Sequence, residues 1–201
     1  LAVEVSSSIV ATAGRVASPV VEVRDDSSLE GDAMLTYGSD AHGCSMTASS
    51  GASVRAASLR LDSREGANCS LAARTTSNIS ATRFSFDGSR TELMDESELT
   101  AELVSFEGDV LSVANDSRVE VGSGGIEART VSLARSSSLT ATDVLNLTAS
   151  AALAVEVSSS IVATAGRVAS PEVEERDDSS LEGDAALTYG SDAHGRSTTA
   201  P

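Results

Sequence analysis

Large side chains are scarce in this sequence. Tryptophan is absent, and aromatic residues make up only 2% of the 201 residues, so an ordinary thick globular core would lack bulk. Proline occurs three times, while valine, leucine and isoleucine are frequent, which argues against a wholly disordered chain. Serine, threonine, alanine and glycine supply most of the remainder. This composition favours a structure of thin, closely stacked layers.

Lysine and glutamine are also absent, and all 14 basic residues are arginine. The formal net charge is −16, with the arginines scattered among 30 acidic residues. A nucleic-acid binder needs a concentrated basic patch, so that class of partner is excluded. The acidic surface is expected to be a solvated, self-repelling one, with divalent-cation binding as the alternative. No apolar run reaches the roughly 20 residues that a membrane-spanning helix needs.

A long internal repeat is present instead. Residues 1–48 match residues 153–200 at 43 of 48 positions, an offset of 152. The five differences are Val20→Glu172, Val23→Glu175, Met34→Ala186, Cys44→Arg196 and Met46→Thr198. We interpret 1–152 as one long repeat, 153–201 as the start of the next copy, and 1–201 as a window of a longer array.

A shorter period of about 20 residues lies inside the long one. Its rows end at Leu29, Ile79, Leu99, Val119, Leu139, Ile161 and Leu181, with Val54 and Leu71 as candidates in the less regular stretch. Apolar residues alternate within rows, as in Val131-Ser132-Leu133, and the stretches "DGS", "EGD" and "GSGG" are expected to be tight turns. The pattern predicts an all-β fold, a parallel β-solenoid of about ten coils running through 1–201.

Rows such as "SSSLTATDVLNLTASAALAVEVSSSIVATAG" resemble the repeats of right-handed parallel β-helices in cell-surface, adhesin-like proteins. The resemblance rests on alternation and on the use of serine, alanine and threonine over most of the chain. It implies an extracellular fibrous or adhesive role, and it implies no particular binding residue.

All four asparagines lie in N-x-S/T sequons: Asn68, Asn78, Asn115 and Asn146. Used sequons would carry N-linked glycans and place the protein outside a eukaryotic cell. The alternative is that a serine-rich sequence produces sequons by chance.

The two cysteines, Cys44 and Cys69, are 25 residues apart, which is about one coil plus a short insertion. That spacing could bring them onto neighbouring rungs within disulfide reach, and two unpaired thiols are the alternative.

Other candidates for chemistry are weaker. Asp40 and His42 lie in "YGSDAHG", repeated around His194, where a metal pair or a solvated turn is possible. Asp25-Asp26 recurs at Asp177-Asp178, but paired acids acting on a polysaccharide would need a unique site in an aromatic-lined cleft. We therefore predict no catalytic, cofactor or metal site and no enzyme activity.

Two functions remain from the sequence. The first is a structural repeat module of an extracellular glycosylated fibre, filament or surface appendage, whose partners are other copies of itself or neighbouring chains. The second is an adhesin-like stalk that contacts polysaccharide, calcium or another surface. The segment 20–23 is expected to lie outside the coil as a loop or edge, with Val20 and Val23 forming a lateral contact, because a buried unpaired Glu in copy two would be costly.

Overall fold

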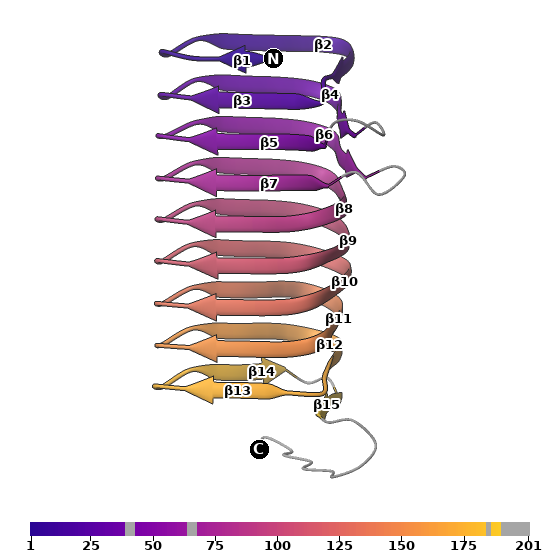
Figure 1. Ribbon diagram of the computed structural model, residues 1–201, viewed down its shortest axis with the longest axis vertical. Helices are drawn as coiled ribbons and strands as arrows, with labels where there is room; N and C mark the ends of the chain where they lie inside the picture. The colour runs from indigo at the N-terminus through magenta and orange to yellow at the C-terminus, as the bar shows by residue number, and fades with distance from the viewer. Residues whose placement is uncertain (39–42, 64–67, 184–185, 190–201) are drawn as a thin grey trace.

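The chain forms a parallel β-solenoid in the computed structural model, which describes residues 1–38, 43–63, 68–183 and 186–189. The coils stack into an elongated rod with β1 and β2 at one end and β13 to β15 at the other (Figure 1). Among the described residues no helix is present, so none could cross a membrane. The predicted all-β solenoid is confirmed.

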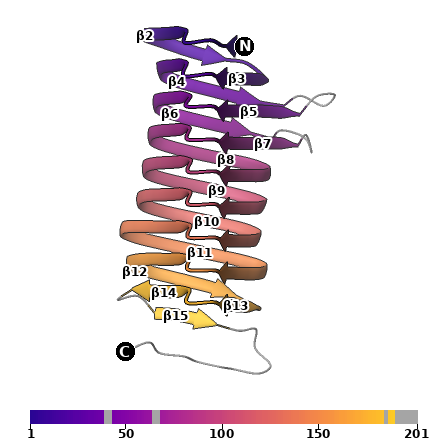
Figure 2. The same cartoon turned by 90° about the vertical axis from the view of Figure 1, so that its left-hand side faces the viewer.

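Fifteen strands build the rod, and each pairs in parallel with strands one coil away. Their bounds are β1 (Ala2–Val3), β2 (Ser8–Ala17), β3 (Val20–Arg24), β4 (Ser28–Tyr37), β5 (Cys44–Ser49), β6 (Ser53–Asp62), β7 (Cys69–Arg74), β8 (Asn78–Met94), β9 (Glu98–Ala114), β10 (Arg118–Ala134), β11 (Ser138–Glu156), β12 (Ser160–Ser170), β13 (Val173–Arg176), β14 (Ser180–Gly183) and β15 (Ala186–Tyr189). Seen from the side, each coil is a flattened loop whose two long walls face each other (Figure 2).

One tight corner recurs in every coil. Two consecutive residues there adopt positive φ angles near 55°, as in Asp25-Asp26 and Asn115-Asp116. The nine corners lie at residues 5–6, 25–26, 50–51, 75–76, 95–96, 115–116, 135–136, 157–158 and 177–178. Asp and Asn tolerate this left-handed conformation because their short side chains can bond locally. Other corners contain residues that disfavour it, such as Val5, Val157 and Thr75-Thr76, so the stacking of the coils holds the backbone in this conformation there. The corners therefore reverse the chain without a long loop.

A serine follows the corner in most coils, and its side chain points inward. Ser77, Ser97, Ser117 and Ser137 are at most 1% exposed. The Ser97 hydroxyl donates to the Met94 carbonyl across the corner (2.7 Å), and the Ser117 hydroxyl accepts the Ser97 backbone N–H from the next coil (3.2 Å). The buried hydroxyls thus satisfy backbone groups that the turn leaves without ladder partners.

Stacked apolar columns fill the space between the walls. The predicted row ends form one such column, joined by direct register pairs: Ile9, Leu29, Val54, Ile79, Leu99, Val119, Leu139, Ile161 and Leu181. Val54 was correctly placed. Leu71 was not, because it pairs with Met46 and Thr91 on the opposite wall. Phe86 and Phe106 stack with ring centroids 4.8 Å apart, and all three phenylalanines lie in the core.

The coil length varies around the predicted 20 residues. Successive corners starting at residues 5, 25, 50, 75, 95, 115, 135, 157 and 177 give steps of 20, 25, 25, 20, 20, 20, 22 and 20. In the described part of the chain the nine corners therefore bound eight full turns, against the ten expected. The three longer coils account for about half a coil of this difference, and the other residues lie before the first corner or after the last.

The stretches "DGS", "EGD" and "GSGG" are not turns between strands. They lie within the 17-residue strands β8, β9 and β10, at two places in the coil. "DGS" of β8 pairs with "EGD" of β9, and "GSGG" of β10 lies about five residues earlier in its coil. Register pairing continues through Gly88 and Gly108, so the strands bend around the coil without losing their ladder bonds. A bend inside a continuous strand contains the same glycine and small polar residues as a turn between strands, so the sequence analysis predicted turns at these positions.

Gly124 and Gly125 provide a matched pair of positions in the "GSGG" stretch. Gly124 has a φ of 146°, and a Cβ there would overlap the Val104 carbonyl oxygen of the neighbouring coil. A Cβ at Gly125 would meet nothing closer than the Asn146 carbonyl oxygen at 3.9 Å. Gly124→Ala is therefore expected to lower the free energy of unfolding by about 2 kcal/mol or more, and Gly125→Ala by less than about 0.5 kcal/mol. Urea unfolding followed by circular dichroism measures both, and equal midpoints would contradict the proposed close approach.

Candidate functional site

The four sequon asparagines occupy three different environments. Asn68 is exposed at the start of β7, and Asn146 is exposed on the outer face of β11. In the stack, Asn146 lies between Gly125 and Arg167, and Gly125 has no side chain to crowd it. These two positions offer space for a bulky glycan on a solvent-facing wall.

Asn78 and Asn115 are half-buried and already bonded. The Asn78 Nδ2 donates to Glu98 Oε2 at 3.1 Å. The Asn115 side chain lies at a tight corner, where its Nδ2 donates to Asp95 Oδ1 (2.7 Å) and its Oδ1 accepts from Arg135 (3.1 Å). A glycan on either Nδ2 would crowd a bond that links two coils.

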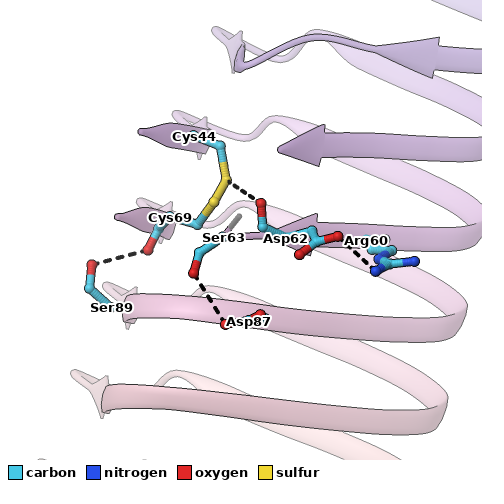
Figure 3. Close-up of a disulfide and its surroundings, with 7 residues drawn as sticks. All are labelled: Cys44, Arg60, Asp62, Ser63, Cys69, Asp87 and Ser89. Atoms are coloured by element: carbon cyan, nitrogen blue, oxygen red, sulfur yellow. Dashed lines mark hydrogen bonds and ion pairs between the residues drawn. A yellow bond between two sulfur atoms is a disulfide. The ribbon is translucent and has the colours of Figure 1, made fainter. Parts of the chain in front are cut away.

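Cys44 and Cys69 are joined by a disulfide, with their Cα atoms 4.4 Å apart (Figure 3). They are direct register partners at the first positions of β5 and β7, so stacking alone brings them together. Both are buried. Each cysteine begins its strand directly after the extra residues of a 25-residue coil. The disulfide therefore joins the two longest coils.

Ordered polar contacts surround the disulfide. Arg60 forms an ion pair with Asp62 at 2.7 Å, the Ser63 hydroxyl donates to Asp87 Oδ1 at 3.2 Å, and the Ser89 hydroxyl donates to the Cys69 carbonyl at 3.1 Å (Figure 3). The two serine contacts join the coil of Cys69 to the next coil, and the disulfide links both to the coil of Cys44. They stabilise the region of the insertions and surround a disulfide whose sulfur atoms are covered by the core.

The segment 20–23 is a regular strand, which corrects the expectation of a loop or edge outside the coil. It belongs to β3, which pairs with β1 on one side and β5 on the other. Val20 is 42% exposed, whereas Val23 is 0% exposed. Alternation puts only one of the two valines on the surface. Val23 is therefore a core residue and cannot make a lateral contact, while Val20 remains available for one.

The acidic and histidine candidates do not form a shared site. Asp25 and Asp26 are exposed corner residues, and Asp177-Asp178 form the equivalent corner seven turns away. Asp40, His42 and His194 lie outside the described residues. Within the described part of the chain, no group of three or more His, Cys, Asp or Glu side chains could hold a metal ion.

A long shallow groove is a concave feature that the sequence analysis missed. Its floor is a column of small residues, each paired with the next along the rod: Ala11, Gly31, Ala56, Ala81, Ala101 and Val121. Two outward columns form its sides, one running through Arg55, Ser80, Thr100 and Glu120 and the other through Asp32, Ala57, Thr82, Glu102 and Gly122. The central part has a volume of about 570 Å³.

The groove follows from the small side chains on the inner face. An alanine or glycine facing the core lets the backbone move inward, and the outer surface then becomes concave along the whole column. The spacing of alanines at 56, 81 and 101 follows the coil length, so this column was visible in the sequence once the coil register was known. Its lining is mainly apolar, with alanine, valine and glycine, and carries the hydroxyls of Ser80, Thr82 and Thr100, the carboxylates of Glu102 and Glu120 and the guanidinium of Arg55, without aromatic rings.

Charged side chains elsewhere form local pairs between coils. Glu92 is buried and bonds to Arg74 at 2.8 Å and also to Arg90. Arg55 lies 3.8 Å from Glu30 at the side of the groove. The arginine side chains in these pairs are more than half exposed, so the pairs contribute modestly to stability.

No protein-family model, curated protein or solved structure matches this chain.

Glycan occupancy provides a test of the asparagine environments. In material secreted from a eukaryotic host, Asn68 and Asn146 are expected to carry glycans at higher occupancy than Asn78 and Asn115, because only the first pair is free of coil-to-coil bonds. Glycopeptide mass spectrometry measures the four occupancies, with single Asn→Gln variants as site controls. Full occupancy of Asn78 and Asn115 with an unchanged melting temperature would contradict this ranking.

Proposed function

We propose that the chain is a structural repeat module of an extracellular, glycosylated fibre, filament or surface appendage. The observation that carries the proposal is the junction between the two copies. The boundary between residues 152 and 153 falls inside β11, which continues without interruption from Ser138 to Glu156. The second copy therefore adds coils to the stack that the first copy began.

The repeat length also fits the coil geometry. The corner at Val5-Ser6 recurs at Val157-Ser158, exactly one 152-residue repeat later and after seven turns. A whole number of turns lets successive copies join in the same register. Backbone hydrogen bonds and apolar columns then extend along the rod, which is the behaviour of a load-bearing or spacing element.

Two features support an extracellular setting. The disulfide between Cys44 and Cys69 fits an oxidising compartment, where such bonds persist. The exposed sequons at Asn68 and Asn146 fit a glycosylated surface, and the acidic charge keeps neighbouring rods apart in solution. We propose an extracellular or cell-surface location on these grounds.

Tandem copies test the structural proposal. Two copies of residues 1–152 joined directly should form a rod about 34 Å longer than one copy, because seven coils each rise about 4.8 Å, with no change in cross-section. Small-angle X-ray scattering measures both dimensions. A tandem chain that scatters as two separate or collapsed bodies would contradict the proposal.

The groove favours a second candidate function, an adhesin-like stalk that holds an extended polysaccharide. Hydroxyl and carboxylate side chains repeat along it at the coil spacing, and such groups bond to sugar hydroxyls. Calcium has weaker support, because the described residues contain no suitable ligand cluster.

Blocking the groove tests this candidate. Thr100→Trp should fill its centre and reduce retardation of the protein in polysaccharide-containing gels by about tenfold or more, since contact with the lining would be lost. Ser150→Trp, at an exposed position of β11 outside the groove and outside the Asn146 sequon, is the matched control. Equal retardation of both variants and the unmodified protein would remove the groove from consideration.

A further inference from the structure

One wall of the rod has an uncharged centre. It is the wall that faces the viewer in Figure 1, and it is built from β3, β5, β7, the last residues of β8 to β11, and β13. Across β9, β10 and β11, eight outward side chains of this wall carry no charge: Val110, Ser112, Ala114, Thr130, Ser132, Ala134, Ala152 and Ala154. We call these eight residues the uncharged face. The chain has a net charge of −16, and a second copy would meet little repulsion at this face.

Opposite charges border the uncharged face at its two ends. On the side of β7 and β8 lie Arg74 and Arg90, which both pair with Glu92 and have side chains more than half exposed. Each guanidinium has five N–H donors, so one carboxylate leaves donors free on both arginines. On the side of β11 and β13, the outward charges are three carboxylates and one arginine: Glu156, Glu172, Glu174 and Arg176. One end of the wall therefore has a positive balance and the other a negative balance.

The order of these charges makes the wall complementary to itself when one rod is reversed. A two-fold axis along the strand direction, between β9 and β10, places β9 of one rod over β10 of the other. The same rotation brings Arg90 beside Glu172 and Arg74 beside Glu156, and each pair occurs twice. Arg176 comes opposite Arg74, but it is already paired with a carboxylate of its own strand. Opposite charges thus meet at both ends of the contact.

The sequons leave this wall uncovered. Asn78 and Asn146 belong to outward columns elsewhere in the coil, Asn115 is a corner residue, and Asn68 precedes β7. Glycans on these residues would project from other parts of the rod. Val20, which is 42% exposed, lies on this wall in β3. The lateral contact expected of Val20 therefore falls on the same surface.

We infer that two copies of this chain associate side by side and antiparallel through this wall. The uncharged faces form the centre of the contact, and the arginine end of each copy lies over the glutamate end of the other. The inference rests on the proposed structural function, because it names the surface through which rods join laterally. Six strands ~4.8 Å apart and about 15 Å wide give roughly 400 Å² of contact per chain, about half of a standard interface, so the association is weak and reversible.

Sedimentation equilibrium on the intact chain tests the inference. The unmodified protein should dimerise reversibly at concentrations below about 1 mM. Ser132→Glu puts a charge in the centre of the contact and should raise the dissociation constant at least about tenfold. Ser105→Glu, at an exposed position of β9 outside this wall, adds the same charge and should raise it less than about twofold. Circular dichroism should show the same β-content for both variants and the unmodified protein.

Glu156→Arg tests the antiparallel order. Removing negative charge from this acidic chain should by itself favour association, as expected for the control Glu102→Arg, which lies in the groove. In the antiparallel pair, Glu156→Arg brings a like charge beside Arg74 and should instead raise the dissociation constant at least about threefold.

Three results would overturn the inference. These are equal effects of the two glutamate-to-arginine variants, equal effects of Ser132→Glu and Ser105→Glu, and an unmodified chain that stays monomeric. Small-angle scattering of the tandem chain decides separately whether the rod itself forms. A rod that lengthens as expected but stays monomeric would therefore remove the lateral contact and leave the structural proposal in place.

Discussion

The tight corner controls the rest of the structure. Two residues with left-handed backbone reverse the chain, and the inward serine that follows bonds both to its own corner and to the next coil. This unit fixes which residue of each coil lies above which residue of the last, and therefore fixes every apolar column. Insertions elsewhere in a coil are tolerated as long as the corner keeps its place, as the two 25-residue coils demonstrate. At the corner between these two coils, Ser50-Gly51, the buried Ala52 occupies the serine position.

The same constraint explains how a chain with so few aromatics builds a core. Each coil needs only enough apolar volume to separate two walls, because stacking covers every inward side chain from above and below. Columns of leucine, isoleucine and valine supply that volume on one side of the coil, and alanine and glycine let the wall move inward on the other. The groove on the outer face is thus a by-product of the core composition.

The sequence predicted the main architecture because the row ends recur in a column that must be buried. Leu99, Val119 and Leu139 stand 20 residues apart, and the structure pairs them directly. The sequence did not predict the positions of the row ends reliably between residues 30 and 78. Two coils there each contain five extra residues, and Leu71, which lies on the opposite wall, has the same sequence surroundings as a row end. The segment 20–23 was misplaced for a different reason. Its interpretation assumed that Glu175 occupies the same environment as Val23, whereas Val23 is enclosed by the next coil and Glu175 is exposed.

The staple between Cys44 and Cys69 has a mechanical consequence. In a rod where each coil contacts only its neighbours, tension applied to one end would peel coils away one after another. The disulfide joins adjacent coils across a 25-residue loop, so those residues could not extend even after their strands had separated. A chain pulled from its first residue would lengthen coil by coil, and the enclosed loop would contribute no length until the bond was reduced. Redox conditions would thereby set the maximum extension of the rod under load.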